Sequence, residues 1–122
     1  GVNRLIPLKV SGPFHTALLA PASKRLSEVL DKVTFSDFEI PLIGNTEAKV
    51  MQYGDIKALL ARQVKEPVRF YDSIETMRKL GMTEVIEIGP GKVLSGFLRK
   101  IDRSIPTASV EDEASLSVLL EK

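Results

Sequence analysis

Apolar residues recur in several stretches of this chain at spacings of three and four residues, which is the period of an amphipathic helix. One stretch runs from Ala17 to Val33, with apolar positions at Ala22, Leu26, Val29, Leu30 and Val33. A second helix is predicted from Asp55, a residue type suited to helix starts, to Val64, with Pro67 as its stop. Capping and turn residues predict three more helices. These are 72–80 with an Asp72–Glu75 capping pair and Gly81 as its C-terminal cap, a helix after Gly89-Pro90-Gly91 ending near Ile101, and 112–120 capped by Asp112.

Short apolar runs separate these helices and predict strands at Leu5–Val10, Phe38–Ile43, Glu84–Ile88 and Ile105–Val110. Pro7 makes the first of them an edge or irregular strand, because proline lacks a backbone donor. Each run is followed by a helix, and this alternation predicts an α/β fold with a mostly parallel sheet flanked by helices. The first strand has no helix before it, and sheets of this class usually contain more strands. We therefore expect the chain to be part of a larger sheet.

Composition narrows the function classes. The 122 residues are 43% hydrophobic and 27% charged with a net charge of +1, which is ordinary for a globular domain. The basic residues form no stripe of the kind that would predict nucleic-acid binding. No apolar run is long enough to predict a membrane span. Cysteine is absent, so disulfides, thiolate metal sites and a cysteine nucleophile are excluded, and a reducing cytoplasm is the expected compartment.

His15 is the only histidine, and it lies where a predicted strand gives way to a helix. Open α/β sheets place their chemistry at strand ends, and a neutral imidazole there can take a proton from a hydroxyl near neutral pH. No carboxylate lies close in sequence to orient the ring, so its partner has to come from the fold. A surface or helix-capping role is the commoner one for a single histidine, and on this residue alone both roles stay open.

Two further features admit a structural and a functional interpretation. Gly89-Pro90-Gly91-Lys92 lacks the glycine spacing and the Ser/Thr of a phosphate-binding Walker loop, so a tight turn is expected, with at most weak attraction of an anion to its amides. Asn45 either closes a turn or binds a ligand. Gln63 either caps its helix or presents a backbone carbonyl, because the last carbonyls of a helix lack partners.

Four segments resemble the sequence motifs of one family, in the right order and at fitting distances. They are Ser11–His15 followed by Leu18, Leu19 and Pro21; Pro41–Thr46; Arg62–Phe70; and Glu87–Gly96. The family is the malonyl-CoA:acyl carrier protein transacylases of fatty-acid synthesis, and the acyltransferase domains of polyketide synthases share these motifs. The resemblance covers essentially the whole chain and less than half of the family's usual length. It implies that residues 1–10 are the last strand of a small ferredoxin-like subdomain, and that residues 11–122 are the C-terminal part of an α/β-hydrolase-like acyltransferase core.

The resemblance also implies a mechanism of ping-pong acyl transfer. A serine in a G-x-S-x-G motif attacks the malonyl thioester of coenzyme A, and the phosphopantetheine thiol of acyl carrier protein then takes the malonyl group. His15 matches the general base and acid, and Gln63 matches the position whose backbone carbonyl orients it. Phe14 and Asn45 match substrate-binding positions, with Phe14 bulky enough to exclude an α-methyl branch. No bound cofactor and no metal are implied; the substrates are malonyl-CoA and the phosphopantetheinylated carrier protein.

The departures from the family pattern are as informative as the matches. The 122 residues contain no G-x-S-x-G and hence no nucleophile, and neither Arg62 nor Arg69 lies in the motif of the arginine that pairs with the malonyl carboxylate. We therefore expect these residues to be inactive alone, and to pair through exposed apolar strand faces with another copy or with the missing N-terminal part of the same enzyme. Two alternatives stay open: an acyltransferase domain of a polyketide synthase, and a non-catalytic binding remnant of the same fold.

Overall fold

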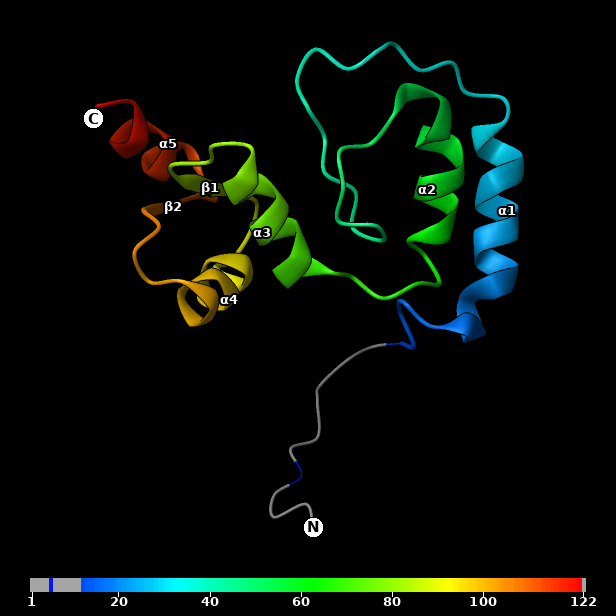
Figure 1. The fold of residues 1–122 in the computed structure, drawn as a ribbon, viewed down its shortest axis with the longest axis horizontal. Helices are drawn as coiled ribbons and strands as arrows, with labels where there is room; N and C mark the ends of the chain where they lie inside the picture. Colours follow the sequence, from blue (N-terminus) through cyan, green and yellow to red (C-terminus); the bar gives the residue numbers. More distant parts are fainter. Residues whose placement is uncertain (1–4, 6–11, 122) are drawn as a thin grey trace. The chain divides into compact units, whose positions relative to one another are not determined.

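The computed structural model describes residue 5 and residues 12–121 of the chain. The predicted strand Leu5–Val10 and the predicted subdomain 1–10 lie outside these residues, apart from Leu5. The chain divides into two compact units, the first ending at Arg69 and the second beginning at Phe70 (Figure 1).

Two helices frame the first unit. A 3-10 turn, η1 (Ala17–Leu19), leads into α1 (Ala20–Leu30), and a second turn, η2 (Tyr53–Asp55), leads into α2 (Ile56–Arg62). Figure 1 shows α1 and α2 lying side by side. The buried hydroxyl of Ser23 donates a hydrogen bond to the Ala61 carbonyl at 2.6 Å. The start of α1 is thereby held against the last turn of α2.

A small apolar core supports this helix pair. Its buried members are Met51, Ile56 and Leu59, and Phe35, Phe38 and Leu60 pack against them. The predicted helices are confirmed in position but are shorter than expected. The first ends at Leu30 and leaves Val33 38% exposed, and the second ends at Arg62 rather than Val64.

The strand predicted over Phe38–Ile43 is wrong. Within the described residues this segment contributes only an isolated antiparallel bridge between Ile43 and Val50. The bridge closes a tight turn in which Gly44 donates to the Lys49 carbonyl at 3.2 Å. Pro41 removes a backbone donor in the middle of the run, and Phe38 packs in the local core instead of alternating across a sheet. The apolar pattern therefore serves local packing.

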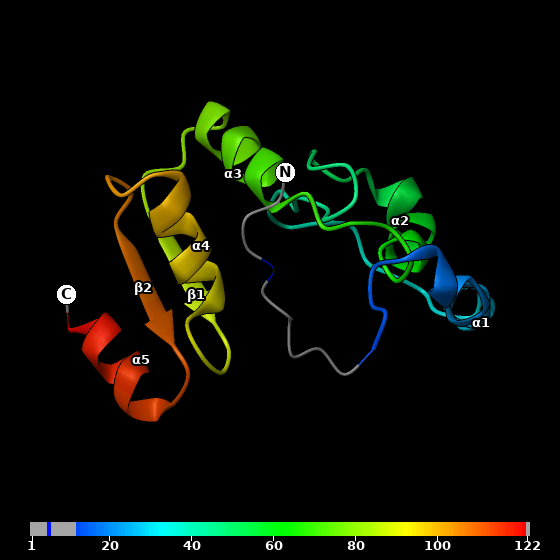
Figure 2. The same ribbon diagram turned by 90° about the horizontal axis from the view of Figure 1, so that it is seen from below.

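The second unit is a β-α-β arrangement with a helix on either end of the chain segment. It contains α3 (Phe70–Lys79), β1 (Val85–Ile88), α4 (Val93–Ile101), β2 (Thr107–Val110) and α5 (Glu113–Leu120). β1 and β2 pair in parallel, from Val85 opposite Thr107 to Ile88 opposite Val110. Figure 2 shows α4 running alongside the strands that it connects. This parallel pair and its helices confirm the α/β class.

Sequence signals located most ends of these elements correctly. Gly81 has a positive φ of 91° at the end of α3, as expected for a C-terminal cap. Asp112 accepts from the Ser115 amide and forms a capping box that starts α5. The Asp72–Glu75 pair does not open α3, because that helix already begins at Phe70, whose ring lies 6.3 Å from the ring of Phe97.

Apolar side chains remain uncovered on β1, where Ile86 is 43% and Ile88 is 83% exposed. None of the helices in the described part of the chain has the length and apolar character needed to cross a membrane. Residues 5 and 12–121 also bring together no group of three side chains able to hold a metal ion.

Candidate functional site

His15 lies in the short segment before η1 and adopts an unusual backbone conformation. Its φ is +60°, in the left-handed region that residues other than glycine adopt only when the surrounding structure holds them there. Two contacts do so. The His15 amide donates to the Val64 carbonyl at 3.2 Å, and the ring atom Nδ1 lies 2.7 Å from the Gln63 carbonyl oxygen. Consecutive carbonyls thus hold both the backbone and the ring of one residue.

These carbonyls are available because α2 ends just before them. Its last helical residue is Arg62, and the chain turns through the next four residues, with the amides of Lys65 and Glu66 both donating to the Arg62 carbonyl. Carbonyls at the end of a helix have no partner within it. Those of Gln63 and Val64 accept from His15 instead.

The contact with Gln63 assigns the tautomer of the imidazole. A carbonyl oxygen only accepts, so Nδ1 carries a proton, and in the neutral ring Nε2 is left with its lone pair. His15 is exposed, so this lone pair is open to an incoming group. The arrangement can take a proton from a hydroxyl or thiol. A neutral carbonyl orients the ring as a carboxylate does in a catalytic triad, although it stabilises the imidazolium less.

Asn45 joins the same group of hydrogen bonds. Its side-chain Nδ2 donates to Oε1 of Gln63 at 3.3 Å, and its carbonyl accepts from the Arg69 amide at 2.9 Å. Asn45 thus lies in a turn with its side-chain amide beside Gln63, and ligand binding by Asn45 stays a prediction. Phe14 stands apart from these bonds: it is 62% exposed, and its ring lies over Gly12.

Sequence reasoning missed a set of ion pairs beside this site. The guanidinium of Arg62 contacts Glu66 at 2.9 Å and Glu47 at 2.6 Å. Hydrogen bonds to Glu66, and then to Glu47, raise the pKa of Arg62 above its already high ordinary value. The spacing of four residues between Arg62 and Glu66 was a readable signal. The approach of Glu47 was not, because Glu47 lies 15 residues away in sequence and is brought to Arg62 only by the fold of the turn after Gly44.

The Gly89–Gly91 turn is occupied by the protein's own carboxylates. Glu111 accepts from the Gly91 amide at 3.0 Å, and Glu87 accepts from the Leu94 and Ser95 amides at the start of α4 at 2.9 and 2.8 Å. The Ser95 hydroxyl also donates to Glu87, and this bond is the main reason that the pKa of Glu87 is lowered. The turn is structural, as expected, and its amides are already used.

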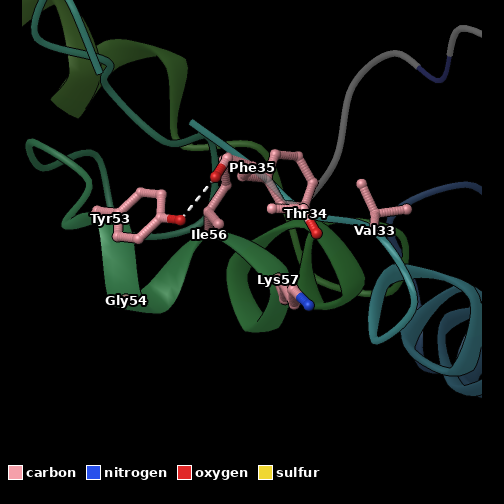
Figure 3. Close-up of a pocket in the computed structure, with 7 residues that line it drawn as sticks. All are labelled: Val33, Thr34, Phe35, Tyr53, Gly54, Ile56 and Lys57. Atoms are coloured by element: carbon pink, nitrogen blue, oxygen red, sulfur yellow. Dashed lines mark hydrogen bonds between the residues drawn. The ribbon is translucent and has the colours of Figure 1, made fainter. Parts of the chain in front are cut away.

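A separate pocket of about 240 Å³ lies in the first unit, and Figure 3 shows its lining. Its walls are Val33, Thr34, Phe35, Tyr53, Gly54, Ile56 and Lys57. The Tyr53 hydroxyl donates to the Phe35 carbonyl at 2.6 Å across it. None of the four candidate site residues lines this pocket, so it is distinct from the histidine site.

Relatives of known name match almost the whole sequence. The malonyl CoA-acyl carrier protein transacylase of Bacillus subtilis is 45% identical over 122 residues, which cover 99% of this chain and 38% of that protein. The transacylase of Escherichia coli is 35% identical, over 99% of this chain and 40% of that protein. No family model matches. The chain spans about two fifths of the length of these curated relatives.

Solved structures give the same result. The MCAT of Streptococcus pneumoniae matches with a TM-score of 0.93 and 66% identity, over 99% of this chain and 40% of that chain. A malonyl-transacylase in complex with a type II PKS acyl-carrier protein matches with a TM-score of 0.90 and 38% identity, over the same shares. Sequence and fold together show that the chain is related, over nearly its whole length, to part of the malonyl CoA-acyl carrier protein transacylases.

Proposed function

We propose that this chain is the histidine-bearing part of an enzyme that transfers a malonyl group from malonyl-CoA to the phosphopantetheine thiol of acyl carrier protein in fatty-acid synthesis. The names of its relatives support the reaction. One observation carries the role of this chain: Nδ1 of His15 lies 2.7 Å from the Gln63 carbonyl, which leaves Nε2 as the base.

In the proposed reaction, Nε2 of His15 takes the proton of a serine hydroxyl that polypeptide outside these residues supplies. The serine oxygen attacks the thioester carbonyl, the C–S bond breaks, and the coenzyme A sulfur leaves with the proton that His15 returns. In the second half-reaction His15 deprotonates the phosphopantetheine thiol, whose sulfur attacks the malonyl-serine ester. The serine oxygen then regains the proton, and the enzyme returns to its starting state.

The neutral orienting group suits this substrate. Imidazolium beside a carbonyl is less stabilised than beside a carboxylate, so the base is weaker than in a protease-like triad. Thioesters are reactive acyl donors, and less assistance suffices. We assign Asn45 and Phe14 to substrate binding, with the amide of Asn45 next to Gln63 and the exposed ring of Phe14 excluding branched acyl groups.

Acyl carrier protein is the proposed macromolecular partner, together with the remaining part of the enzyme. The solved complex of a similar malonyl-transacylase with a carrier protein supports the first. The exposed apolar side chains of Ile86 and Ile88 on β1 support the second. The cysteine-free sequence supports a cytoplasmic setting.

The same complex favours a second candidate, in which the acceptor is the carrier protein of a polyketide synthase rather than of fatty-acid synthesis. The two candidates share the site and differ in the acceptor. Rates of malonyl transfer to the two kinds of carrier protein, measured side by side, distinguish them.

The test is malonyl transfer by the longer protein and by the 122 residues alone. General acid–base catalysis contributes about 10²–10⁴-fold, so His15→Ala in the longer protein should lower kcat/KM by that factor. Glu28→Ala, an exposed change on α1, is the control and should have no effect. Unchanged transfer by His15→Ala would refute the proposal. So would turnover by the 122 residues alone that His15→Ala abolishes, because these residues carry no G-x-S-x-G serine. A longer protein that binds the carrier without turnover would be the non-catalytic remnant.

A further inference from the structure

Arg62 joins three segments of the first unit through a single side chain. It is the last residue of α2, Glu66 lies in the turn that follows, and Glu47 lies in the turn that begins at Gly44. Nε and Nη2 of Arg62 donate to the two carboxylate oxygens of Glu66 at 2.9 and 3.0 Å. Nη1 donates to Glu47 at 2.6 Å. The guanidinium therefore binds one carboxylate bidentately and a second one at its far edge.

The position of these contacts is more informative than their strength. The side chain of Arg62 is 40% exposed, and ion pairs at that exposure are typically worth about 1 kcal/mol or less. Overall stability is therefore a weak reason for this arrangement. A bidentate pair, by contrast, fixes direction as well as distance. Its two ends, Arg62 and Glu66, bracket Gln63 and Val64, the residues whose carbonyls hold His15.

Further bonds brace the same turn. The Glu66 amide donates to the Arg62 carbonyl at 3.0 Å, so main chain and side chain both close the turn. From the other side, Asn45 donates to the Gln63 side chain at 3.3 Å. Glu47 and Asn45 belong to one turn, which is thus attached to the end of α2 at both residues.

We propose that Arg62 is a positioning residue: by binding Glu66 and Glu47 it fixes the peptide groups of Gln63 and Val64, so that their carbonyls hold His15 with its proton on Nδ1. The structural part of this proposal stands on the geometry alone, and its consequence for catalysis rests on the proposed function. Misplacement of a catalytic group by about 1 Å can cost about 10²-fold in rate. Three N–H donors of the guanidinium are used by these two carboxylates, whose charges offset its own, so we do not assign Arg62 to the malonyl carboxylate.

The first test reads the imidazole itself, by ¹⁵N NMR on the 122-residue chain. The wild-type ring should show the Nδ1–H tautomer. Arg62→Gln should shift it toward the Nε2–H tautomer that free imidazole favours. Arg62→Lys should do the same, because lysine keeps the charge but cannot form the bidentate pair. The proposal would be overturned if Arg62→Gln kept the wild-type Nδ1–H tautomer, or if Arg62→Lys showed that tautomer while Arg62→Gln did not.

Arg78→Gln is the matched control, because Arg78 also lies between two carboxylates, those of Glu75 and Asp102, and is similarly exposed. It lies in the second unit and should leave the His15 signals unchanged; the same tautomer shift in Arg78→Gln would overturn the proposal. If Arg62→Gln does not fold, Glu66→Gln decides instead, because it keeps one acceptor and removes the charged bidentate pair. A smaller shift of the same kind supports the proposal, and a wild-type spectrum overturns it.

The second test is kinetic and uses the longer protein. Arg62→Gln should lower kcat by about 10–100-fold, within the range for a displaced catalytic group, and should leave the KM for malonyl-CoA unchanged. A raised KM with unchanged kcat would show that Arg62 binds substrate, and would overturn the positioning role. Absence of turnover in the wild-type longer protein would refute the proposed function alone, since the NMR result judges the positioning role independently.

Discussion

The left-handed backbone at His15 leads to a quantitative prediction about stability. We expect His15→Gly to be more stable than His15→Ala by about 1 kcal/mol. Both changes remove the ring and its bond to the Gln63 carbonyl, so their difference reports the backbone alone. At φ +60° an L-residue costs roughly 1–2 kcal/mol. Glycine avoids that cost, but it destabilises the folded state by roughly 0.5–1 kcal/mol because it has greater conformational freedom in the unfolded chain.

Thr16 provides a control of opposite sign. Its backbone is extended, with φ −130° and ψ 162°, and its hydroxyl donates to the Pro13 carbonyl at 2.8 Å. Thr16→Gly and Thr16→Ala both lose that bond, and without strain to relieve, alanine should be the more stable by roughly 0.5–1 kcal/mol.

Urea denaturation followed by circular dichroism at 222 nm measures all four variants. The free-energy difference within each pair comes from the shift in midpoint, provided that the m-values agree. The reasoning is refuted if alanine is the more stable residue at both positions, because His15 would then occupy an ordinary conformation in solution.

Two further predictions concern the second unit. Leu98 is 1% exposed on α4, and Leu98→Ala should lower the free energy of unfolding by about 2–5 kcal/mol. Leu94 is 46% exposed on the same helix, and Leu94→Ala should lower it by less than about 1 kcal/mol. Equal losses of stability in urea denaturation would contradict the packing described. The pKa of Glu87 is lowered from its ordinary value of 4.5 mainly by the Ser95 hydroxyl, so its contribution to stability is present above pH 4.5 and is lost as the pH falls through the lower folded value. The wild type should therefore exceed Glu87→Gln in stability at pH 7, with the gap narrowing at pH 3, and a gap independent of pH would show that the charge of Glu87 is not involved.

The extent to which the sequence predicted the fold depends on how local each signal is. The helices α1 and α2 follow from periodicity, and residues such as Gly81 and Asp112, which act within one turn of the chain, locate the end of α3 and the start of α5. β1 and β2 lie in short runs bounded by turn residues. The run Phe38–Ile43 has the same appearance, but Pro41 and the packing of Phe38 redirect it. Local pattern does not reveal whether a neighbouring strand is present to pair with an apolar run.

The site shows the same division. His15 stood out as the only histidine, but its partner is 48 residues away in sequence, and only the family resemblance indicated Gln63. The contact with Glu47 was missed because Glu47 lies 15 residues from Arg62 in sequence, and the pairing depends on how the turn after Gly44 folds back on the end of α2. The left-handed conformation of His15 was missed as well, because that conformation follows from two carbonyls contributed by a distant segment rather than from the residues beside it.

The hydroxyl of Ser23 that reaches the Ala61 carbonyl has a consequence for inactivation by heat. The histidine segment leads into one of the joined helices, and its orienting carbonyls leave the end of the other. Warming that loosens this pair of helices separates the imidazole from its acceptor while the remaining elements are still folded. In the longer protein of the proposed function, loss of turnover should then precede cooperative melting, and the tautomer of the ring should report that local opening.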